Sequence, residues 1–290
     1  MAVTVGSMLG AAATALAKAG HREPRRRGRQ LIAGALGVSA AELLAMSERV
    51  LDCTAVKRLH GLIWRLAEGE PLSRILGRRE FWGLDFQLSR FTLDPRPETE
   101  TVIAAVLARI DRGHSDKVLD LGTGSGCLLL ALLSELPLAA GIGVDCLEGA
   151  VTTARRNARL LGLADRCRFL VGRWGAAITH RFDIIVTNPP YIATSAMHGL
   201  PYEVKEFDPP SALDGGEDGL NAYRVIASEL RVLSAPSALF VCEIGAGQAA
   251  AVAAILDSHG LHVEGTERDL SGIERCVVAR YTVDQLSDRA

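Results

Sequence analysis

The chain of 290 residues has few aromatic residues, no long hydrophobic run and almost no net charge. No apolar run reaches the roughly 18 residues needed to cross a bilayer, so we expect no membrane span and no membrane partner. Acidic residues number 34 and basic residues 32, a net charge of −2. Proteins that bind nucleic acid usually carry a basic field, because phosphate neutralisation dominates their affinity. We therefore expect no direct nucleic acid contact, and the basic stretch 21–29 is interpreted as a solvated helix face.

The six cysteines form no CxxC pair and have no spacing with histidine that is typical of a metal site. They are interpreted as free thiols in a reducing compartment. His259 and His262 are a close histidine pair, interpreted as structural or surface residues, so we expect no metal site. The N-terminal segment lacks the basic region of a secretory signal. The cytoplasm is the expected location, with an organelle as the open alternative.

Residues 1–72 are predicted to form a small helical domain. Pro24 stands where a second helix would begin and Gly37 where it would end. Ser39–Glu42 has the S-x-x-E pattern of a capping box. A longer amphipathic helix is predicted over 48–67, and the glycine and proline within 68–71 end it. The domain is therefore predicted to consist of short helices with well-defined ends.

Residues 73–92 change the period of the sequence, because apolar and polar residues alternate after 81–83. This segment is predicted to be a linker or a β-hairpin. Residues 93–290 form a second predicted domain, in which strands alternate with helices from residue 117. The strands are expected at 118–122, 141–145, 167–172, 182–188 and 238–245, followed by a closing antiparallel pair. Such alternation predicts an open α/β sheet with helices on both faces and a ligand site at the carboxyl ends of its strands.

A glycine-rich turn, DLGTGSG over 120–126, joins the first strand to a helix. Its glycines permit tight turning and the close approach of a ligand. The pattern is GxGxG rather than the GxGxxG of a dinucleotide fold, and no GK[ST] of a phosphate loop is present. Asp145 ends the next strand, where a carboxylate can accept hydrogen bonds from both hydroxyls of a ribose. An acid at a helix N-terminus is the alternative, but with the glycine turn we prefer a nucleoside cofactor.

The segment Asn188-Pro189-Pro190-Tyr191 directly follows the fourth strand, at the rim of the same crevice. It is compatible with a rigid turn. In a chemical interpretation, the Asn188 side-chain oxygen and the Pro189 carbonyl accept hydrogen bonds from the two hydrogens of an NH₂ group. The prolines fix φ and thereby fix the direction of these two acceptors. Tyr191 offers an aromatic face to a planar amide or base. This pattern favours methyl transfer from S-adenosyl-L-methionine to a conjugated nitrogen by positioning and fixed dipoles. No Cys or Ser nucleophile has a convincing His partner.

DLGTGSG, Asp145 and NPPY resemble class I S-adenosylmethionine-dependent methyltransferases of amino nitrogens. GEPLSRILGRREFWG, DPRPETE and SALDGGEDGLNAYR narrow the resemblance to the HemK/PrmC family, over nearly the whole chain. Those enzymes methylate N5 of the glutamine in the Gly-Gly-Gln loop of class I peptide chain release factors. The resemblance implies a Rossmann-like, seven-stranded mixed sheet and an N-terminal helical domain that docks the release factor. We expect the enzyme to act as a monomer.

The resemblance also implies roles for individual residues. The cofactor S-adenosyl-L-methionine is expected to contact Gly122, Thr123, Gly124, Ser125, Gly126, Asp145, Trp174 and Asn188. Asp145 would bind the ribose, and Trp174 matches a position that contacts the adenine, although a core tryptophan is the alternative. The substrate amide is expected to contact Asn188, Pro189, Pro190 and Tyr191. Of these, Asn188, Pro189 and Tyr191 are the catalytic candidates.

The chain departs from the family pattern at two positions. Arg173 precedes Trp174 where many relatives carry an acid, which puts a polar contact to the adenine amino group in doubt. Asp94 precedes Pro95 where an apolar residue is common, and it is interpreted as a surface change. Arg96, Glu98 and Glu100 fit a loop beside the cofactor and a salt-bridged helix cap equally well, so they are left unassigned.

Three other functions remain open. A glutamine methyltransferase of ribosomal proteins would share every catalytic residue and differ mainly in the N-terminal domain. A nucleic-acid amino methyltransferase would also contain NPPY, but it needs a broad basic groove. A cofactor-binding fold used only as an assembly module is disfavoured, because Asp145 and NPPY are intact.

Overall fold

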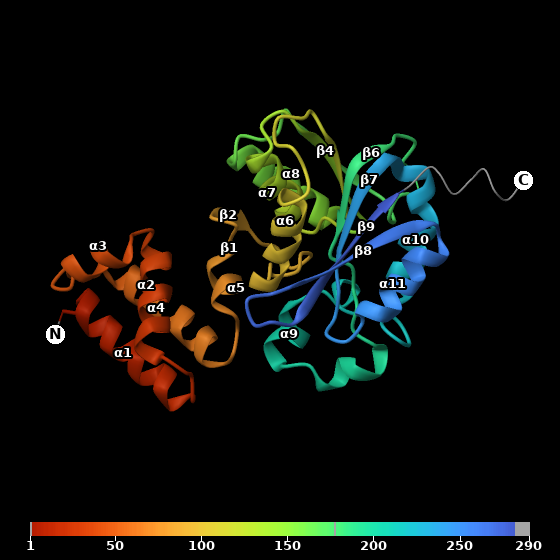
Figure 1. Ribbon diagram of the computed structural model, residues 1–290. Coiled ribbons are helices and arrows are strands. Elements are labelled where there is room, and N and C mark those ends of the chain that lie inside the picture. Colours follow the sequence, from red (N-terminus) through yellow and green to blue (C-terminus); the bar gives the residue numbers. More distant parts are fainter. Residues whose placement is uncertain (1, 177, 282–290) are drawn as a thin grey trace, which may run out of the picture. The chain divides into compact units, whose positions relative to one another are not determined.

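The computed structural model describes residues 2–176 and 178–281 (Figure 1). Their packing divides them into two compact units. The first ends at Arg78 and includes the later segment Pro201–Phe207, whereas the second comprises Arg79–Leu200 and continues from Asp208. Within these residues no helix has the length and apolarity needed to cross a membrane.

The first unit is helical, and its core is formed by apolar side chains such as Met8, Leu31 and Leu59. Its helices are α1 (Val5–Lys18), α2 (Pro24–Leu36), α3 (Ala40–Ala45), α4 (Cys53–Ala67), α5 (Leu72–Leu76) and α9 (Tyr202–Phe207). The Ser39–Glu42 capping box is present, and Pro24 begins α2 as predicted. The prediction of a helix from residue 48 was wrong. The Asp52 side chain accepts a hydrogen bond from the Ala55 N–H at 2.8 Å, and this N-cap starts α4 at Cys53.

The predicted hairpin is present and consists of β1 (Arg78–Phe81) and β2 (Leu84–Gln87), which lie in the second unit from Arg79 onward. Trp82 and Gly83 form its two-residue turn with φ angles of 52° and 71°. Positive φ at both central positions matches the twist of the flanking strands.

A seven-stranded mixed sheet follows, in the order β5-β4-β3-β6-β7-β9-β8. Its strands are β3 (Lys117–Leu121), β4 (Ala140–Asp145), β5 (Cys167–Val171), β6 (Phe182–Thr187), β7 (Ser234–Glu243), β8 (Leu261–Arg268) and β9 (Glu274–Tyr281). β3 pairs in parallel with both β4 and β6, while β9 runs antiparallel to β7 and β8. The predicted seven-stranded mixed sheet is confirmed. The strand order reverses at β3, and ligands of such sheets bind at that point.

Helices cover both faces of this sheet (Figure 1). One face packs against α6 (Glu100–Leu107), α7 (Cys127–Glu135) and α8 (Glu148–Leu160). The other face packs against α10 (Asn221–Leu233) and α11 (Ala249–Ser258). The segment 192–219, between β6 and α10, reads in the sequence as a long loop, but the structure differs. The segment contains the short turns η2 (Thr194–Gly199) and η3 (Pro210–Ala212) besides α9.

Candidate active site

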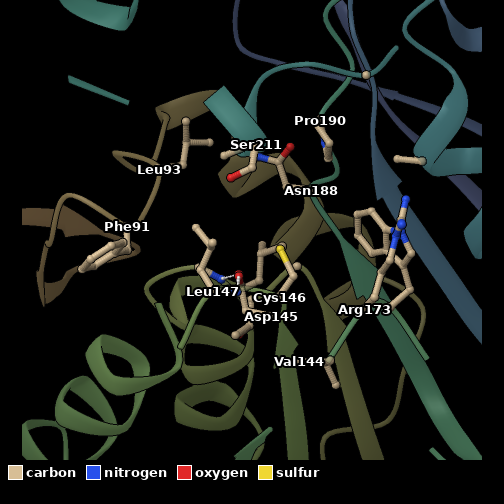
Figure 2. A pocket seen from close by; sticks show the side chains of 18 of the residues that line it. Phe91, Leu93, Val144, Asp145, Cys146, Leu147, Arg173, Asn188, Pro190 and Ser211 are labelled. Carbon is tan, nitrogen blue, oxygen red and sulfur yellow. Dashed lines mark hydrogen bonds between the residues drawn. The ribbon is translucent and has the colours of Figure 1, made fainter. Parts of the chain in front are cut away.

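A cavity of about 530 Å³ lies at the carboxyl ends of β3, β4 and β6. Residues at the end of these strands or directly after them line the cavity, among them Gly122, Asp145 and Asn188. Asn188 and Pro190 lie across the cavity from Asp145 (Figure 2). The volume falls within the range of pockets that bind small molecules and cofactors. The sheet therefore places three motifs distant in sequence around one ligand-sized space.

The glycine-rich turn forms one wall of the cavity. Gly122, Gly124 and Gly126 have φ angles of 75°, 55° and 83°, a region that L side chains rarely adopt. Gly122, Thr123, Gly124 and Ser125 line the cavity. Gly126 is not among the described lining residues. A Cβ there would lie 3.2 Å from the Ala154 Cβ, so its small size instead lets α7 pack against α8.

Buried polar groups hold this turn. The Thr123 hydroxyl donates to Asp120 Oδ2 at 2.6 Å. Burial raises the pKa of Asp120 to about 7, and the Thr123 hydrogen bond offsets part of the rise. The Ser125 hydroxyl is buried beside the cavity and interacts with the Cys127 thiol, but it has no partner of full hydrogen-bond geometry among the described residues. An unsatisfied buried hydroxyl is costly unless a ligand or water completes it, so this wall fits a polar ligand.

The Asp145 carboxylate is oriented by the backbone on both sides. Its Oδ2 accepts a hydrogen bond from the Gly124 N–H and its Oδ1 one from the Leu147 N–H, each at 2.9 Å. Burial raises the pKa of Asp145, and these N–H groups offset part of the rise. Each carboxylate oxygen retains a lone pair for a further donor. The carboxylate can therefore accept hydrogen bonds from ligand hydroxyls while it stays fixed to the glycine turn.

Trp174 lies beside this turn in a left-handed conformation, with φ of 50°. A Cβ on Gly122 would come within 3.3 Å of its indole. Trp174 lines the cavity and also packs against the core on the α10 side of the sheet. Both interpretations of this residue thus have a basis in its contacts. Arg173 lines the cavity as well.

The NPPY segment contributes unequally to the cavity. Asn188 and Pro190 line it, whereas Pro189 and Tyr191 are not among its described lining residues. The Asn188 Nδ2 donates to the Thr99 hydroxyl at 3.2 Å. The Tyr191 hydroxyl donates to Glu243 Oε1 at 3.3 Å, at the end of β7. The segment is therefore anchored at both of its ends by residues of other elements.

Three of these supporting residues were missed in the sequence. Thr99 lies inside PRPETE, but the spacing there does not reveal that it meets Asn188. Glu243 lies inside the strand predicted over 238–245, ends the observed β7 and is 1% exposed. Gln248 donates through Nε2 to the Tyr191 carbonyl at 3.0 Å and accepts at Oε1 from the Gly245 N–H. Polar residues at the carboxyl ends of strands were the available signal.

The interpretation of Asp94 as a surface change was wrong. Asp94 is 4% exposed and pairs with Arg79 at 3.7 Å. Its backbone N–H donates to Asp208 Oδ1 at 3.2 Å, and Arg96 pairs with Oδ2 of the same carboxylate at 2.5 Å. Asp208 therefore ties the DPRPETE loop to the segment that precedes α10.

The chain is similar to known methyltransferases along most of its length. Residues 7–77 match the family model of the PrmC N-terminal domain, and residues 99–200 match that of the methyltransferase small domain. The release factor glutamine methyltransferase of Rhodospirillum rubrum is 47% identical over 279 residues, which cover 96% of this chain and 86% of that protein. The one from Agrobacterium fabrum is 42% identical over 281 residues, covering 96% and 97%.

The fold is also found among solved structures. A methyltransferase from Pyrococcus furiosus superposes with a TM-score of 0.52, over 76% of this chain and 98% of that chain. The identity of the two sequences is only 12%, so this similarity concerns the fold alone.

Proposed function

The chain belongs to the release factor glutamine methyltransferase family, and from that premise we propose how its cavity works. The enzyme transfers a methyl group from S-adenosyl-L-methionine to N5 of the glutamine in the Gly-Gly-Gln loop of a class I peptide chain release factor. One observation carries the assignment of the site: the glycine turn, Asp145 and Asn188 line a single cavity. A cofactor pocket and an amide-binding loop are thereby adjacent.

We propose that the cofactor lies along the wall formed by β3 and β4. Gly122, Thr123, Gly124 and Ser125 would hold its methionine and ribose end, with Gly126 shaping the turn behind them. Asp145 would accept hydrogen bonds from the ribose, and Trp174 would contact the adenine. The unsatisfied Ser125 hydroxyl and the open space where a Cβ on Gly124 would point support this placement. When bound, S-adenosyl-L-methionine supplies an electrophilic methyl group on a sulfonium sulfur.

We propose that Asn188 and Pro189 hold the substrate amide. An amide nitrogen is a poor nucleophile because its lone pair is delocalised. The Asn188 Oδ1 and the Pro189 carbonyl would accept its two hydrogens, which raises electron density on nitrogen and aligns it for in-line attack. Pro190 keeps this loop rigid, and the ring of Tyr191 would pack on the planar amide. No strong base is needed beforehand, since the nitrogen releases its proton readily once it is cationic.

The remaining features of the enzyme are proposals as well. Residues 1–72 would dock the release factor, 73–92 would form a linker and hairpin, and 93–290 would carry out the chemistry. We propose that the enzyme acts as a monomer in the cytoplasm without direct contact to nucleic acid. The net charge of −2 and the six free cysteines support this view.

Mass spectrometry tests the proposed function directly. The enzyme is incubated with S-adenosyl-L-methionine and either a purified release factor or a mixture of ribosomal proteins. We expect one additional methyl group on the glutamine of the Gly-Gly-Gln loop, and none with Asn188→Ala over the same time. Methylation of ribosomal proteins alone would contradict the proposed substrate and leave the assignment of the site intact.

A further inference from the structure

The side-chain amide of Asn188 has two ends with opposite hydrogen-bonding character. Only Oδ1 can accept a hydrogen from a substrate amide, whereas Nδ2 would repel it. Nothing within Asn188 decides which end faces the cavity. Its Nδ2 donates to the Thr99 hydroxyl at 3.2 Å, and Oδ1 is therefore the end left to face the cavity that Asn188 lines. The orientation of this amide depends on Thr99.

The Thr99 hydroxyl in turn needs an acceptor for its own hydrogen. It receives the Asn188 hydrogen on a lone pair, so its O–H must point elsewhere. It lies against the buried Glu243 carboxylate and interacts with it. Glu243 Oε2 is buried and has no partner of full hydrogen-bond geometry among the described residues. An ionised carboxylate only accepts, so it directs the Thr99 hydrogen towards itself.

The same carboxylate also holds the other end of the NPPY segment. The Tyr191 hydroxyl donates to Glu243 Oε1 at 3.3 Å. Glu243 is not among the described residues that line the cavity, and its side chain is almost completely buried. A carboxylate costs several kcal/mol to bury without a compensating cation or donors. Its place between Thr99 and Tyr191 thus points to a role in the site rather than in packing.

We propose that Glu243 is a positioning residue for methyl transfer, which acts through Thr99 to keep Asn188 Oδ1 facing the substrate and through Tyr191 to anchor the same loop. This inference rests on the proposed role of Asn188 as the acceptor of the substrate amide. It adds two residues, Thr99, which lines the cavity, and Glu243, which is not among its described lining residues, and neither is proposed to donate a proton to the substrate. Their function is to select one of two orientations of an amide.

Ionisation of Glu243 makes the orientation of the Asn188 amide depend on pH. Burial raises the pKa of Glu243 to about 7, while Thr99, Tyr191 and Arg275 offset part of the rise and Glu98 adds to it. A protonated Glu243 carries an O–H group and can donate a hydrogen bond to the Thr99 hydroxyl. Thr99 is then free to donate to Asn188, which favours the reversed amide. The rate of methyl transfer is therefore expected to rise as the pH passes through about 7 and Glu243 ionises.

Substitutions at both positions test the relay. Thr99→Val removes the hydroxyl at nearly constant volume, Thr99→Ser retains it, and Glu243→Gln retains the shape but can present either a donor or an acceptor. Thr101→Val, two residues further along and outside the cavity lining, is the matched control. For each variant we would measure cofactor affinity by calorimetry and the single-turnover rate of release factor methylation at saturating cofactor, with circular dichroism to verify folding.

We expect Thr99→Val to lower the rate about 10- to 100-fold while the cofactor dissociation constant changes less than about twofold. Thr99→Ser restores most of the rate, and Thr101→Val behaves like the wild type. Glu243→Gln lowers the rate about 10-fold and removes the rise near pH 7. Because Glu243 acts on Asn188 through Thr99 and on the same loop through Tyr191, the rate loss in the double variant Thr99→Val, Glu243→Gln is expected to be smaller than the product of the two single losses.

Three results would overturn the relay. They are a Thr99→Val rate within about twofold of the wild type, a Thr99→Ser variant as slow as Thr99→Val, and losses that multiply in the double variant. If Asn188→Ala is inactive while Thr99→Val keeps a rate within about twofold of the wild type, the relay fails and the proposed function stands. If the wild-type enzyme methylates no release factor, the proposed function fails and the relay with it.

Discussion

The Asp145 carboxylate accepts a hydrogen bond from the backbone N–H of Gly124 at 2.9 Å, although the two residues follow different strands. The contact joins the end of β4 to the turn after β3. It also fixes the direction of the remaining lone pairs of Asp145, because Leu147 holds the second oxygen. Asp145, the proposed ribose ligand, and the glycine turn are consequently one structural unit, and the roles of its residues can be separated by substitution.

Asp145→Ala is expected to weaken cofactor binding. Hydrogen bonds to a charged group contribute about 1.5–3 kcal/mol, so the dissociation constant for S-adenosyl-L-methionine should rise about 10- to 100-fold. The rate at saturating cofactor should change much less, because the proposed partner of Asp145 is the ribose and not the substrate amide. Isothermal titration calorimetry measures the affinity, with the exposed Asp165→Ala as control. An unchanged affinity would refute the ribose assignment.

Asn188→Ala is expected to have the opposite profile. It removes the proposed acceptor of the substrate amide, and loss of one preorganised polar group in an active site typically costs about 100-fold or more in rate. Cofactor affinity should stay within about threefold of the wild type, because the other cofactor contacts remain. Single-turnover kinetics and calorimetry on the same preparation separate the two effects. Equal losses of affinity and rate would argue against this role.

The features that could be predicted from the sequence are those encoded within a few residues. The capping box at Ser39–Glu42, the alternation of strands and helices, and the order of strand, glycine turn and helix are local patterns, and the structure has them. The start of α4 was misplaced because periodicity continues upstream of its N-cap, Asp52. A side-chain cap outweighs a periodic pattern at the end of a helix.

What could not be predicted depends on contacts between distant segments. Thr99 and Asn188 are 89 positions apart, and no local spacing links them. The GxGxG pattern likewise does not tell which glycine faces the ligand and which faces a helix. Asp94 looked like a surface residue because its partners Arg79 and Asp208 come from other elements. Tertiary packing decided these cases.

Gly124→Ala and Gly126→Ala form a pair that separates ligand approach from helix packing. Both glycines have positive φ, so both substitutions carry a similar strain of about 1 kcal/mol. A Cβ on Gly126 also meets the Ala154 Cβ at 3.2 Å, whereas one on Gly124 meets no atom within 4 Å and points into open space. Gly126→Ala should therefore lower the thermal midpoint more than Gly124→Ala does. Its total loss of stability is expected to be about 2 kcal/mol, which lowers the thermal midpoint by roughly 4–8 °C.

Gly124→Ala is expected to lower cofactor affinity more than Gly126→Ala does, because its new methyl group occupies the cavity. Differential scanning fluorimetry and calorimetry provide the two measurements. The assignment of Gly126 to packing fails if both variants lose affinity equally and keep equal thermal midpoints.

The buried carboxyl of Asp120 is expected to make stability depend on pH. Its pKa is about 7 in the folded protein, whereas an aspartate in an unfolded chain titrates near 4. The folded state thus binds the proton more tightly, and the free energy of unfolding falls as the pH rises from about 4 to about 7. Asp120→Asn cannot ionise and keeps an acceptor for the Thr123 hydroxyl.

Asp120→Asn should therefore raise the thermal midpoint relative to the wild type at pH 8. The gain should be smaller at pH 5, by on the order of 2 kcal/mol, because the wild-type carboxyl is then protonated in the folded state. Thermal unfolding at both pH values measures the difference, with the exposed Asp165→Asn as a control that should change little at either. A gain of equal size at pH 5 and pH 8 would mean that Asp120 does not titrate in this range. The Thr123 hydrogen bond would then hold an ionised carboxylate inside the turn.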